Sequence, residues 1–323
     1  MMYKKIILFA SAALLFHSCA KDEKSARRFI TIGTGGLTGV YYPVGGAVSK
    51  MVNEGYAQHK IRATAESTGG SVFNINAVLS GDVEFGIAQS DRQFQAWNGE
   101  AEWSAGPQKN LRVICALHPE SVTLLAAEDS GIRSIRDLEG KRVNIGDPGS
   151  GNRGNAIDAL KNAGLDWEKD IKAEQLKAVE SANLLQDGRI DAYFYTVGHP
   201  NGSIMEATAG ARKMRFIPIT DTEKLISENP FYAKSIIPAS MYPSAVNKED
   251  TLTYGVKATL ITSSEVPDDI AYAVTKAIFE NINDFITLHP SLSLLTPENM
   301  IEGNTAPYHN GALRYFKESG LIK

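Results

Sequence analysis

Short apolar strands alternate with amphipathic helices along most of the chain, and this alternation restricts the fold more than any other feature. Residues 29–33, 61–66 and 83–88 have the length and apolar content of buried strands, while residues 71–80 carry apolar side chains at helical spacing. Strands that alternate with helices connect through right-handed crossovers and build mostly parallel sheets flanked by helices. The sequence therefore predicts an α/β fold.

A second unit of the same kind follows the first. Residues 143–146 predict a strand, residues 153–162 a helix and residues 188–195 another strand. A chain of 323 residues also exceeds what one hydrophobic core usually holds. We therefore predict two lobes, joined by strands at 121–127 and 253–261 that form a hinge. The first lobe is expected to comprise residues 29–126 and 254–323, and the second lobe residues 127–253.

The N-terminus has the features of an export signal. Lys4 and Lys5 precede an apolar run at 6–16, which is too short to span a bilayer. We predict a signal peptide at 1–18, lipidation of Cys19 at a sequence that resembles a bacterial lipobox, and a flexible tether at 19–28. An ordinary secretory signal with an incidental cysteine is the alternative. The lipid anchor would hold the protein on a membrane in the periplasm or another extracytoplasmic space.

Glycine, serine and threonine gather where the predicted strands end. The segments are 33–43, 67–71, 89–91, 149–153 and 196–199. In open α/β sheets, ligands bind beyond the carboxyl ends of the strands. Glycines allow close approach of the backbone, and free N–H groups at helix starts favour anions. Each segment alone is equally compatible with a tight strand-to-helix turn. Tyr41, Tyr42 and the aromatic residues at 193–195 are candidates for the walls of a site or, equally, for the core.

The sequence contains no recognisable catalytic or cofactor motif. The glycines at 33–39 lack the spacing of a dinucleotide fingerprint, and no Walker motif or Gly-x-Ser-x-Gly motif is present. His118 and His199 each precede proline, which predicts turns, and no histidine pair has metal-ligand spacing. Cys115 lies in an apolar run and is interpreted as buried and inert. With a net charge of −4 and no basic cluster, nucleic-acid binding is not expected. We predict a protein that is no enzyme and holds no cofactor or metal.

Several segments together resemble the TAXI-type solute-binding proteins of TRAP transporters. They are Ile-Gly-Thr-Gly-Gly at 32–36, Gly-Val-Tyr-Tyr-Pro-Val-Gly at 39–45, Ser-Thr-Gly-Gly-Ser at 67–71, Asn-Ile at 74–75, Gly-Ile-Ala-Gln-Ser-Asp at 86–91, Asp-Leu-Glu-Gly-Lys-Arg-Val at 137–143, Gly-Ser-Gly at 149–151 and Ile-Pro-Ala at 237–239. The resemblance covers nearly the whole mature chain in order. It implies a two-lobed periplasmic-binding-protein fold with two crossing strands (type II).

The resemblance also implies a function and a site. The protein would capture a small anionic ligand, glutamate or another carboxylate, by closing its lobes, and would deliver it as a monomer to a TRAP permease. The candidate ligand-binding residues are Thr34, Gly35, Tyr41, Ser67, Thr68, Gln89, Ser90, Ser150, Gly151, Asn152, Arg153 and Thr196. Arg92 and Arg153 are the candidate cations, although either could instead pair with an acid. A sensory protein that presents its ligand to a membrane partner, or an extracytoplasmic enzyme, is the alternative.

Overall fold

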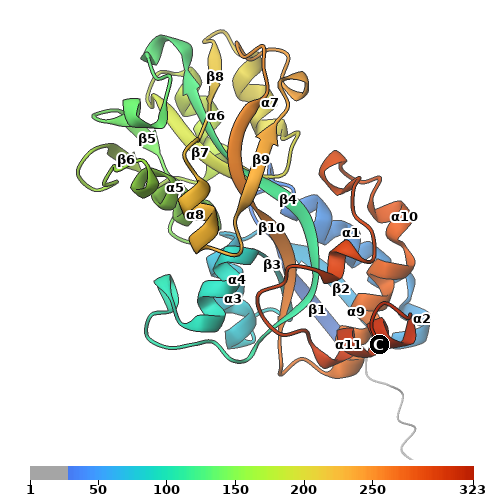
Figure 1. Ribbon diagram of the computed structural model, residues 1–323. Helices are drawn as coiled ribbons and strands as arrows, with labels where there is room; N and C mark the ends of the chain where they lie inside the picture. Colours follow the sequence, from blue (N-terminus) through green and yellow to red (C-terminus); the bar gives the residue numbers. More distant parts are fainter. Residues whose placement is uncertain (1–27) are drawn as a thin grey trace, which may run out of the picture.

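Two long strands, β4 (Leu111–Ala127) and β10 (Thr251–Ser263), run through the middle of the molecule and join its two lobes (Figure 1). They pair antiparallel with each other. The computed structural model describes residues 28–323. The predicted signal peptide, the lipidation at Cys19 and all of the predicted tether except its last residue lie outside the described residues. The predicted two-lobed α/β fold with two crossing strands is confirmed.

β4 continues through a proline at which we predict a turn. His118 lies inside this strand and is fully buried, so the turn predicted at this position is wrong. The strand accommodates Pro119 because the pairing of β4 with β10 shifts register between Lys257 and Thr259, as at a β-bulge. On its other side, β4 pairs with β7 (Ala192–Val197) only from Ser121 onward, so the missing N–H of the proline removes no bond from that pairing.

The first lobe contains three parallel strands with helices packed around them. Its strands are β1 (Arg28–Gly33), β2 (Ile61–Glu66) and β3 (Phe85–Gln89), and its helices are α1 (Tyr41–Glu54), α2 (Tyr56–His59), α3 (Ser71–Ser80), α4 (Ser90–Asn98), α9 (Asp268–Glu280), α10 (Ile282–Phe285) and α11 (Asn310–Glu318). β1 lies between β2 and β3 and pairs with both in parallel. Helix α9 packs against α1 and α11, so the C-terminal segment completes the first lobe.

The second lobe repeats this plan with shorter strands. Its strands are β5 (Arg142–Asn144), β6 (Lys172–Glu174), β7 (Ala192–Val197), β8 (Met214–Ile217) and β9 (Ala233–Ile237), and its helices are α5 (Gly151–Asn162), α6 (Ala178–Gln186), α7 (Gly202–Ala209) and α8 (Glu223–Glu228). β5 lies between β6 and β7 and pairs with both in parallel. The lobe boundaries at 126/127 and 253/254 remain predictions.

All the strands belong to one mixed sheet. Their order is β2-β1-β3-β10-β4-β7-β5-β6, with β8 beside β4 and β9 beside β10. The parallel pairing that we predict occurs within each lobe, whereas the crossing strands pair antiparallel with all their neighbours. The remaining turns are 3-10 helices, namely η1 (Ala101–Trp103), η2 (Glu128–Ser130), η3 (Ile135–Leu138), η4 (Ala239–Met241), η5 (Pro290–Leu292) and η6 (Asn299–Ile301).

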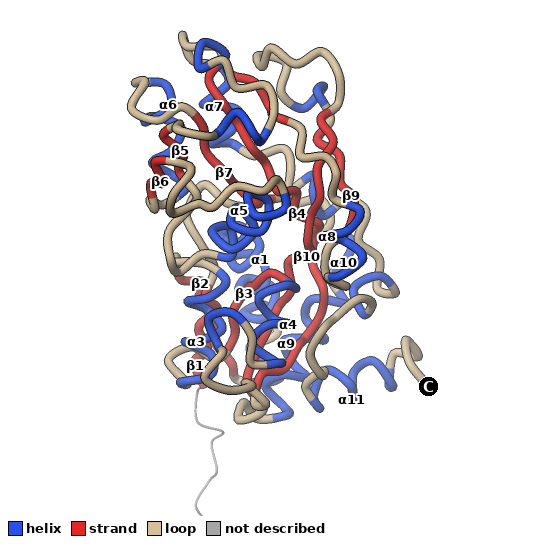
Figure 2. The backbone as a smooth tube through the Cα atoms, turned by 60° about the vertical axis from the view of Figure 1, so that its left-hand side comes forward, coloured by secondary structure: helices blue, strands red, loops and turns tan. Residues whose placement is uncertain are grey.

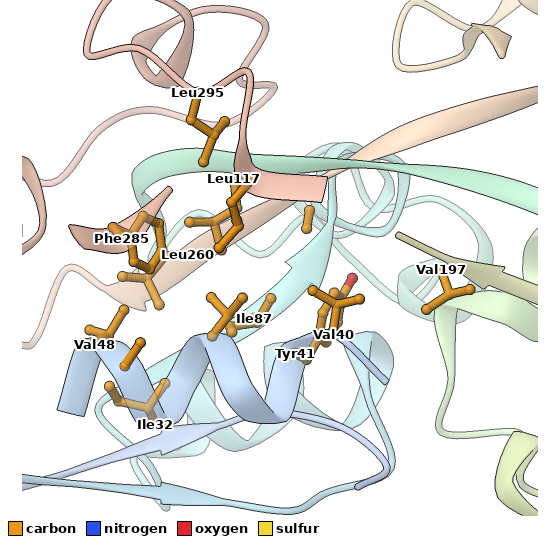
Figure 3. Close-up of a cluster of buried hydrophobic side chains, with 14 of the residues drawn as sticks. Ile32, Val40, Tyr41, Val48, Ile87, Leu117, Val197, Leu260, Phe285 and Leu295 are labelled. Carbon is orange, nitrogen blue, oxygen red and sulfur yellow. The ribbon is translucent and has the colours of Figure 1, made fainter. Parts of the chain in front are cut away.

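The first-lobe core extends up to the space between the lobes. Helix α1 buries Val44, Val48 and Val52, which are four residues apart and therefore lie on one face. Figure 3 shows Val48 packed near Ile32, while Val40 and Tyr41 lie at the other end of this cluster and Val197 lies across from them on β7. The start of α1 is thus fixed by core packing at the point where the two lobes meet.

Candidate ligand-binding cleft

A cavity of about 300 Å³ lies between the two lobes, at the carboxyl ends of their parallel strands. Its lining consists of residues 35–41, 67–71, 89, 120, 147, 150–152, 177–179 and 195–197. Figure 2 shows α1 and α5, whose first residues line the cavity, near the middle of the molecule. The lining comes from both lobes, because the carboxyl ends of the parallel strands in the two lobes face each other across the hinge.

Most of the candidate residues come together around this cavity. Those that line it are Gly35, Tyr41, Ser67, Thr68, Gln89, Ser150, Gly151, Asn152 and Thr196. Thr34, Ser90 and Arg153 do not. The Thr34 hydroxyl donates to the carbonyl of Glu66 at 2.6 Å, and the Ser90 hydroxyl accepts from the backbone N–H of Lys257 at 3.2 Å. Their ligand-binding role remains a prediction that the geometry does not support.

Neither candidate arginine faces the cavity. Arg153 donates to Gln175 Oε1 at 3.0 Å and lies over the ring of Trp167, 4.9 Å from its centroid. Arg92 is buried among acidic side chains between α4 and α5. The cation among the described lining residues is Lys177, which we did not select. It precedes α6 and follows the short strand β6, which we did not recognise because it is only three residues long.

One asparagine in each lobe holds two strand ends together. Asn74 Nδ2 donates to the carbonyl of Thr34, directly after β1, at 2.6 Å and to the carbonyl of Ile87, in β3, at 2.7 Å. Asn152 Nδ2 donates to the carbonyls of Phe194 at 3.1 Å and Ile145 at 3.4 Å, so it joins β7 to the segment that follows β5, and its Oδ1 accepts from the N–H of Thr196 at 2.9 Å. The amide of Asn152 is thus engaged by protein, so this residue shapes the cavity wall more than it offers free hydrogen-bonding groups.

Replacing Asn74 by alanine should lower the free energy of unfolding by about 2–4 kcal/mol, because two buried carbonyls lose their donor. Chemical denaturation measured by circular dichroism checks this expectation. The matched control is Asn98→Ala, which removes an exposed asparagine on α4 and should cost less than about 1 kcal/mol. Equal losses in the two variants would contradict the bridging role of Asn74.

Five helices begin at the wall of the cavity. They are α1, α3, α4, α5 and α6, and the first residue of each, or the residue before it, is part of the lining. Four of them have no side-chain cap, whereas Ser150 caps α5 by accepting from the N–H of Arg153 at 3.3 Å. Uncapped N–H groups and the positive ends of the helix dipoles therefore converge on this space, which favours a negatively charged occupant.

Two buried side chains offer further hydrogen-bonding capacity to the cavity. Gln89 Oε1 and Thr196 Oγ1 are buried and have no hydrogen-bond partner among the described residues. Buried polar atoms are nearly always satisfied in native proteins, so an unpartnered pair at one cavity indicates groups that a ligand or water completes. The hydroxyl of Ser67, by contrast, donates to the carbonyl of Gly35 at 2.8 Å and supports the loop after β1.

The cavity also contains two carboxyl groups that we did not predict. Glu120 lies on β4 and its Oε2 accepts from the Tyr41 hydroxyl at 2.7 Å. Burial raises the pKa of Glu120 to about 8, which outweighs the lowering effect of the Tyr41 hydrogen bond. Asp147 lies on the loop after β5, and partial burial raises its pKa as well. A glutamate after a proline in an apolar strand carries no sequence signal for a site.

The two lobes contact each other directly at several points around the cavity. The N–H of Phe73 donates to the carbonyl of Gly149 at 3.1 Å, and Asn201 Nδ2 donates to the carbonyl of Thr38 at 2.8 Å. Between α4 and α5, Asn155 Nδ2 donates to Asp91 Oδ2 at 2.6 Å. These bonds hold the lobes together over the cavity.

Three further observations concern the parts of the molecule away from the cleft. Cys115 is fully buried in β4, and burial raises the pKa of its thiol, as expected for an unreactive cysteine. Within residues 28–323, no group of three or more His, Cys, Asp or Glu side chains is arranged to hold a metal ion. No helix in the same part of the chain is long and apolar enough to cross a membrane.

The fold and the cleft define a class: two-lobed α/β proteins with crossing strands, as in periplasmic binding proteins. Residues 32–320 match the NMT1-like family, which is most of the chain. The chain therefore belongs to the NMT1-like family.

Several solved structures align with this chain at low sequence identity. A protein of Bordetella bronchiseptica RB50 aligns with a TM-score of 0.57 and 14% identity, over 90% of this chain and 98% of its own. The periplasmic aliphatic sulphonate binding protein SsuA of Escherichia coli aligns with a TM-score of 0.46 and 15% identity, over 84% and 80%. The probable amino-acid ABC transporter extracellular-binding protein ytmK of Bacillus subtilis aligns with a TM-score of 0.47 and 16% identity, over 82% and 97%. At such identities the likeness concerns the fold alone.

Proposed function

We propose that this protein is an extracytoplasmic solute-binding receptor that captures one small anionic ligand between its lobes and returns it unchanged. The observation that carries this proposal is the cavity of about 300 Å³ at which five helices from both lobes begin. A space of this size accommodates a ligand at the small end of those that proteins bind in clefts, such as an amino acid or a dicarboxylate. Closure of two lobes around a ligand is the expected mechanism.

The ligand class that we propose is a carboxylate, with L-glutamate or a related acid as the first candidate. Backbone N–H groups at the helix starts would bind its oxygens, and Lys177 would contribute a cation from the second lobe. Because no arginine lines the cavity among the described residues, the helix starts rather than a bidentate guanidinium would supply most of the stabilisation.

We further propose that the receptor is tethered by acylated Cys19 and delivers its ligand to a membrane permease of the TRAP type. This assignment of the permease rests on the sequence resemblance to TAXI-type receptors. The structural neighbour ytmK is described as part of an ABC transporter, which makes an ABC permease the competing partner. Reconstituting uptake with each class of permease, driven by an ion gradient or by ATP, distinguishes the two.

The proposal is tested on the purified protein by identifying what it binds. Native mass spectrometry of protein purified without added ligand should show a copurifying small acid, recovered unchanged after denaturation. Titration with L-glutamate, L-aspartate and 2-oxoglutarate should raise the melting temperature and produce heat, whereas L-arginine should do neither. A carboxylate panel without heat or melting shift at about millimolar concentration would overturn the ligand class.

Replacing Lys177 by glutamine should weaken binding of the carboxylate about tenfold, since a charge-assisted hydrogen bond is lost. Isothermal titration calorimetry of both proteins measures the change in the dissociation constant. Lys172→Gln is the matched control, because Lys172 is an exposed lysine on β6 that does not line the cavity. If both variants bind as the parent protein does, Lys177 has no part in the site.

A further inference from the structure

Glu120 lies in the cavity wall with few groups to stabilise a negative charge. It is 3% exposed, and its Oε2 accepts one hydrogen bond, from the Tyr41 hydroxyl at 2.7 Å. Its Oε1 has no hydrogen-bond partner among the described residues, and the nearest basic group is His118 Nε2 at 3.9 Å. A buried carboxylate usually has several donors or a cation, so this environment is poorly suited to the ionised form.

The groups that face Glu120 from neighbouring elements do not supply a cation. On β4, burial and, to a smaller extent, nearby His289 lower the pKa of His118 to about 3, so this imidazole stays neutral. Asp91 on α4 disfavours ionisation of Glu120 by its own negative charge. From β7, Tyr195 is neutral, because burial raises its pKa to about 12. Burial and the nearby charge of Asp91 raise the pKa of Glu120 to about 8, although the hydrogen bond from Tyr41 lowers it.

Among the described residues, no lysine or arginine forms an ion pair with Glu120. Lys257, the neighbour on β10, directs its ammonium to the carbonyl of Glu302 at 3.3 Å. Lys177 and Asp147 line the same cavity from the second lobe and carry opposite charges. An anion that enters this cavity beside an ionised Glu120 would meet the like charge of a buried carboxylate. A neutral carboxylic acid would instead offer that anion a hydrogen-bond donor.

We propose that Glu120 is a specificity-determining residue that binds the ligand as a neutral carboxylic acid, with its Oε1–H donating to a ligand oxygen. The inference rests on the proposed function, since it presumes an anionic ligand in this cavity. The proton comes from solvent and stays on Glu120, so no covalent bond of the ligand changes. Above the pH at which Glu120 ionises, capture of one anion is accompanied by uptake of one proton.

The test compares the full mature protein with Glu120→Gln, whose amide copies the neutral acid as donor and still accepts from Tyr41. The probes are L-glutamate and 2-oxoglutarate, and the second has no group that titrates between about pH 6 and pH 9. At about pH 6 the dissociation constants of the two proteins should agree within about threefold. Near pH 9 the parent protein should bind about tenfold more weakly than at pH 6, whereas the affinity of the glutamine variant should be the same at both pH values. Calorimetry near pH 9, in two buffers of different ionisation enthalpy, should show that ligand binding is accompanied by proton uptake in the parent protein and not in the glutamine variant. Glu206→Gln, which changes an exposed glutamate on α7, is the control and should behave as the parent protein.

The inference would be overturned if the glutamine variant bound the probes about tenfold or more weakly than the parent protein at pH 6 and if the affinity of the parent protein did not change with pH. That result would mean that Glu120 is ionised and pairs with a positive group of the ligand.

Two readouts need no ligand and therefore separate this inference from the proposed function. Carbon NMR of labelled glutamate should show the Glu120 carboxyl titrating above about pH 7, and titration below about pH 5 would refute a neutral acid even if neither probe binds.

The second readout is stability. Because the pKa of Glu120 is raised in the folded protein, its contribution to stability is fully present below the ordinary glutamate pKa and is lost as the pH rises through about 8. The parent protein should therefore lose stability relative to Glu120→Gln across this window. An unchanged difference between the two proteins at all pH values would contradict the inference.

Discussion

Replacing Arg92 by methionine should lower the free energy of unfolding by about 3–5 kcal/mol, the largest loss that we expect from any single charged side chain here. The Arg92 side chain is 3% exposed, and its Nη2 lies 3.1 Å from Asp91 Oδ2 and 3.7 Å from Asp158 Oδ2. Methionine keeps much of the volume but leaves two carboxylates without their cation. Removing one partner of a buried ion pair is costly because the other stays buried and charged.

The position of this ion pair makes it a link between the lobes. Asp91 and Arg92 belong to α4 in the first lobe, while Asn155 and Asp158 belong to α5 in the second. The Tyr232 hydroxyl donates to Asp158 Oδ2 at 2.5 Å and completes the cluster. Gly154 lies directly against the Arg92 guanidinium, so the two helices can approach closely only where α5 has no side chain.

Equilibrium unfolding in guanidinium chloride measures the effect of this substitution. Arg314→Met is the matched control, because Arg314 forms an exposed pair with Glu318 on α11 and should contribute less than about 1 kcal/mol. A loss for Arg92→Met that does not exceed that of the control would show that Asp91 and Asp158 need no cation.

Replacing Gly151 by alanine should weaken ligand binding by about a hundredfold, because the closed arrangement of the lobes becomes inaccessible for most molecules. A methyl group at this position would overlap the carboxamide of Gln89 and would lie 2.8 Å from Ser71 Oγ. Gln89 is 2% exposed, so its carboxamide could avoid the methyl group only by turning into the cavity that the ligand would occupy. Since Gly151 belongs to the second lobe and the other two residues to the first, the clash is relieved by opening the cleft.

Small-angle X-ray scattering and calorimetry together measure this effect. The variant should have a larger radius of gyration than the parent protein and should not contract when L-glutamate is added. Gly46→Ala is the matched control: it lies on the exposed side of α1, no atom lies within 4 Å of the added methyl group, and it should stabilise the helix by up to about 1 kcal/mol. Unchanged scattering and affinity for Gly151→Ala would mean that Gln89 gives way and that the lobes still close.

Local patterns were sufficient to predict the secondary structure that builds the cleft. The helix at 71–80 has the predicted bounds, and Pro267 directly precedes helix α9. These features depend on neighbours in the chain: apolar spacing and residues with fixed backbone preferences. The single long strand β4 was not predicted as one element, because Pro119 interrupts its local pattern and only pairing with β10 keeps it extended.

The site was predicted at the level of loops rather than of individual groups. The strand-end rule selected the segments around Gly35, Ser67 and Ser150, and these do surround one cavity. This rule does not predict which way a side chain points. It therefore did not indicate that the Asn152 amide hydrogen-bonds to the backbone at strand ends, or that the Arg153 guanidinium donates to Gln175. Side-chain direction depends on partners that are distant in sequence, and no local pattern records them.

The sequence by itself determined the alternation of strands and helices and the glycine-rich segments that end the strands. Both follow from periodicity and backbone freedom, which are properties of short stretches of chain. Only the tertiary structure decided that Glu120 and Lys177 face the same cavity and that Arg92 does not. The physical reason is that register between distant strands and packing between helices of different lobes fix which side chains are desolvated, and hence which charges a ligand meets.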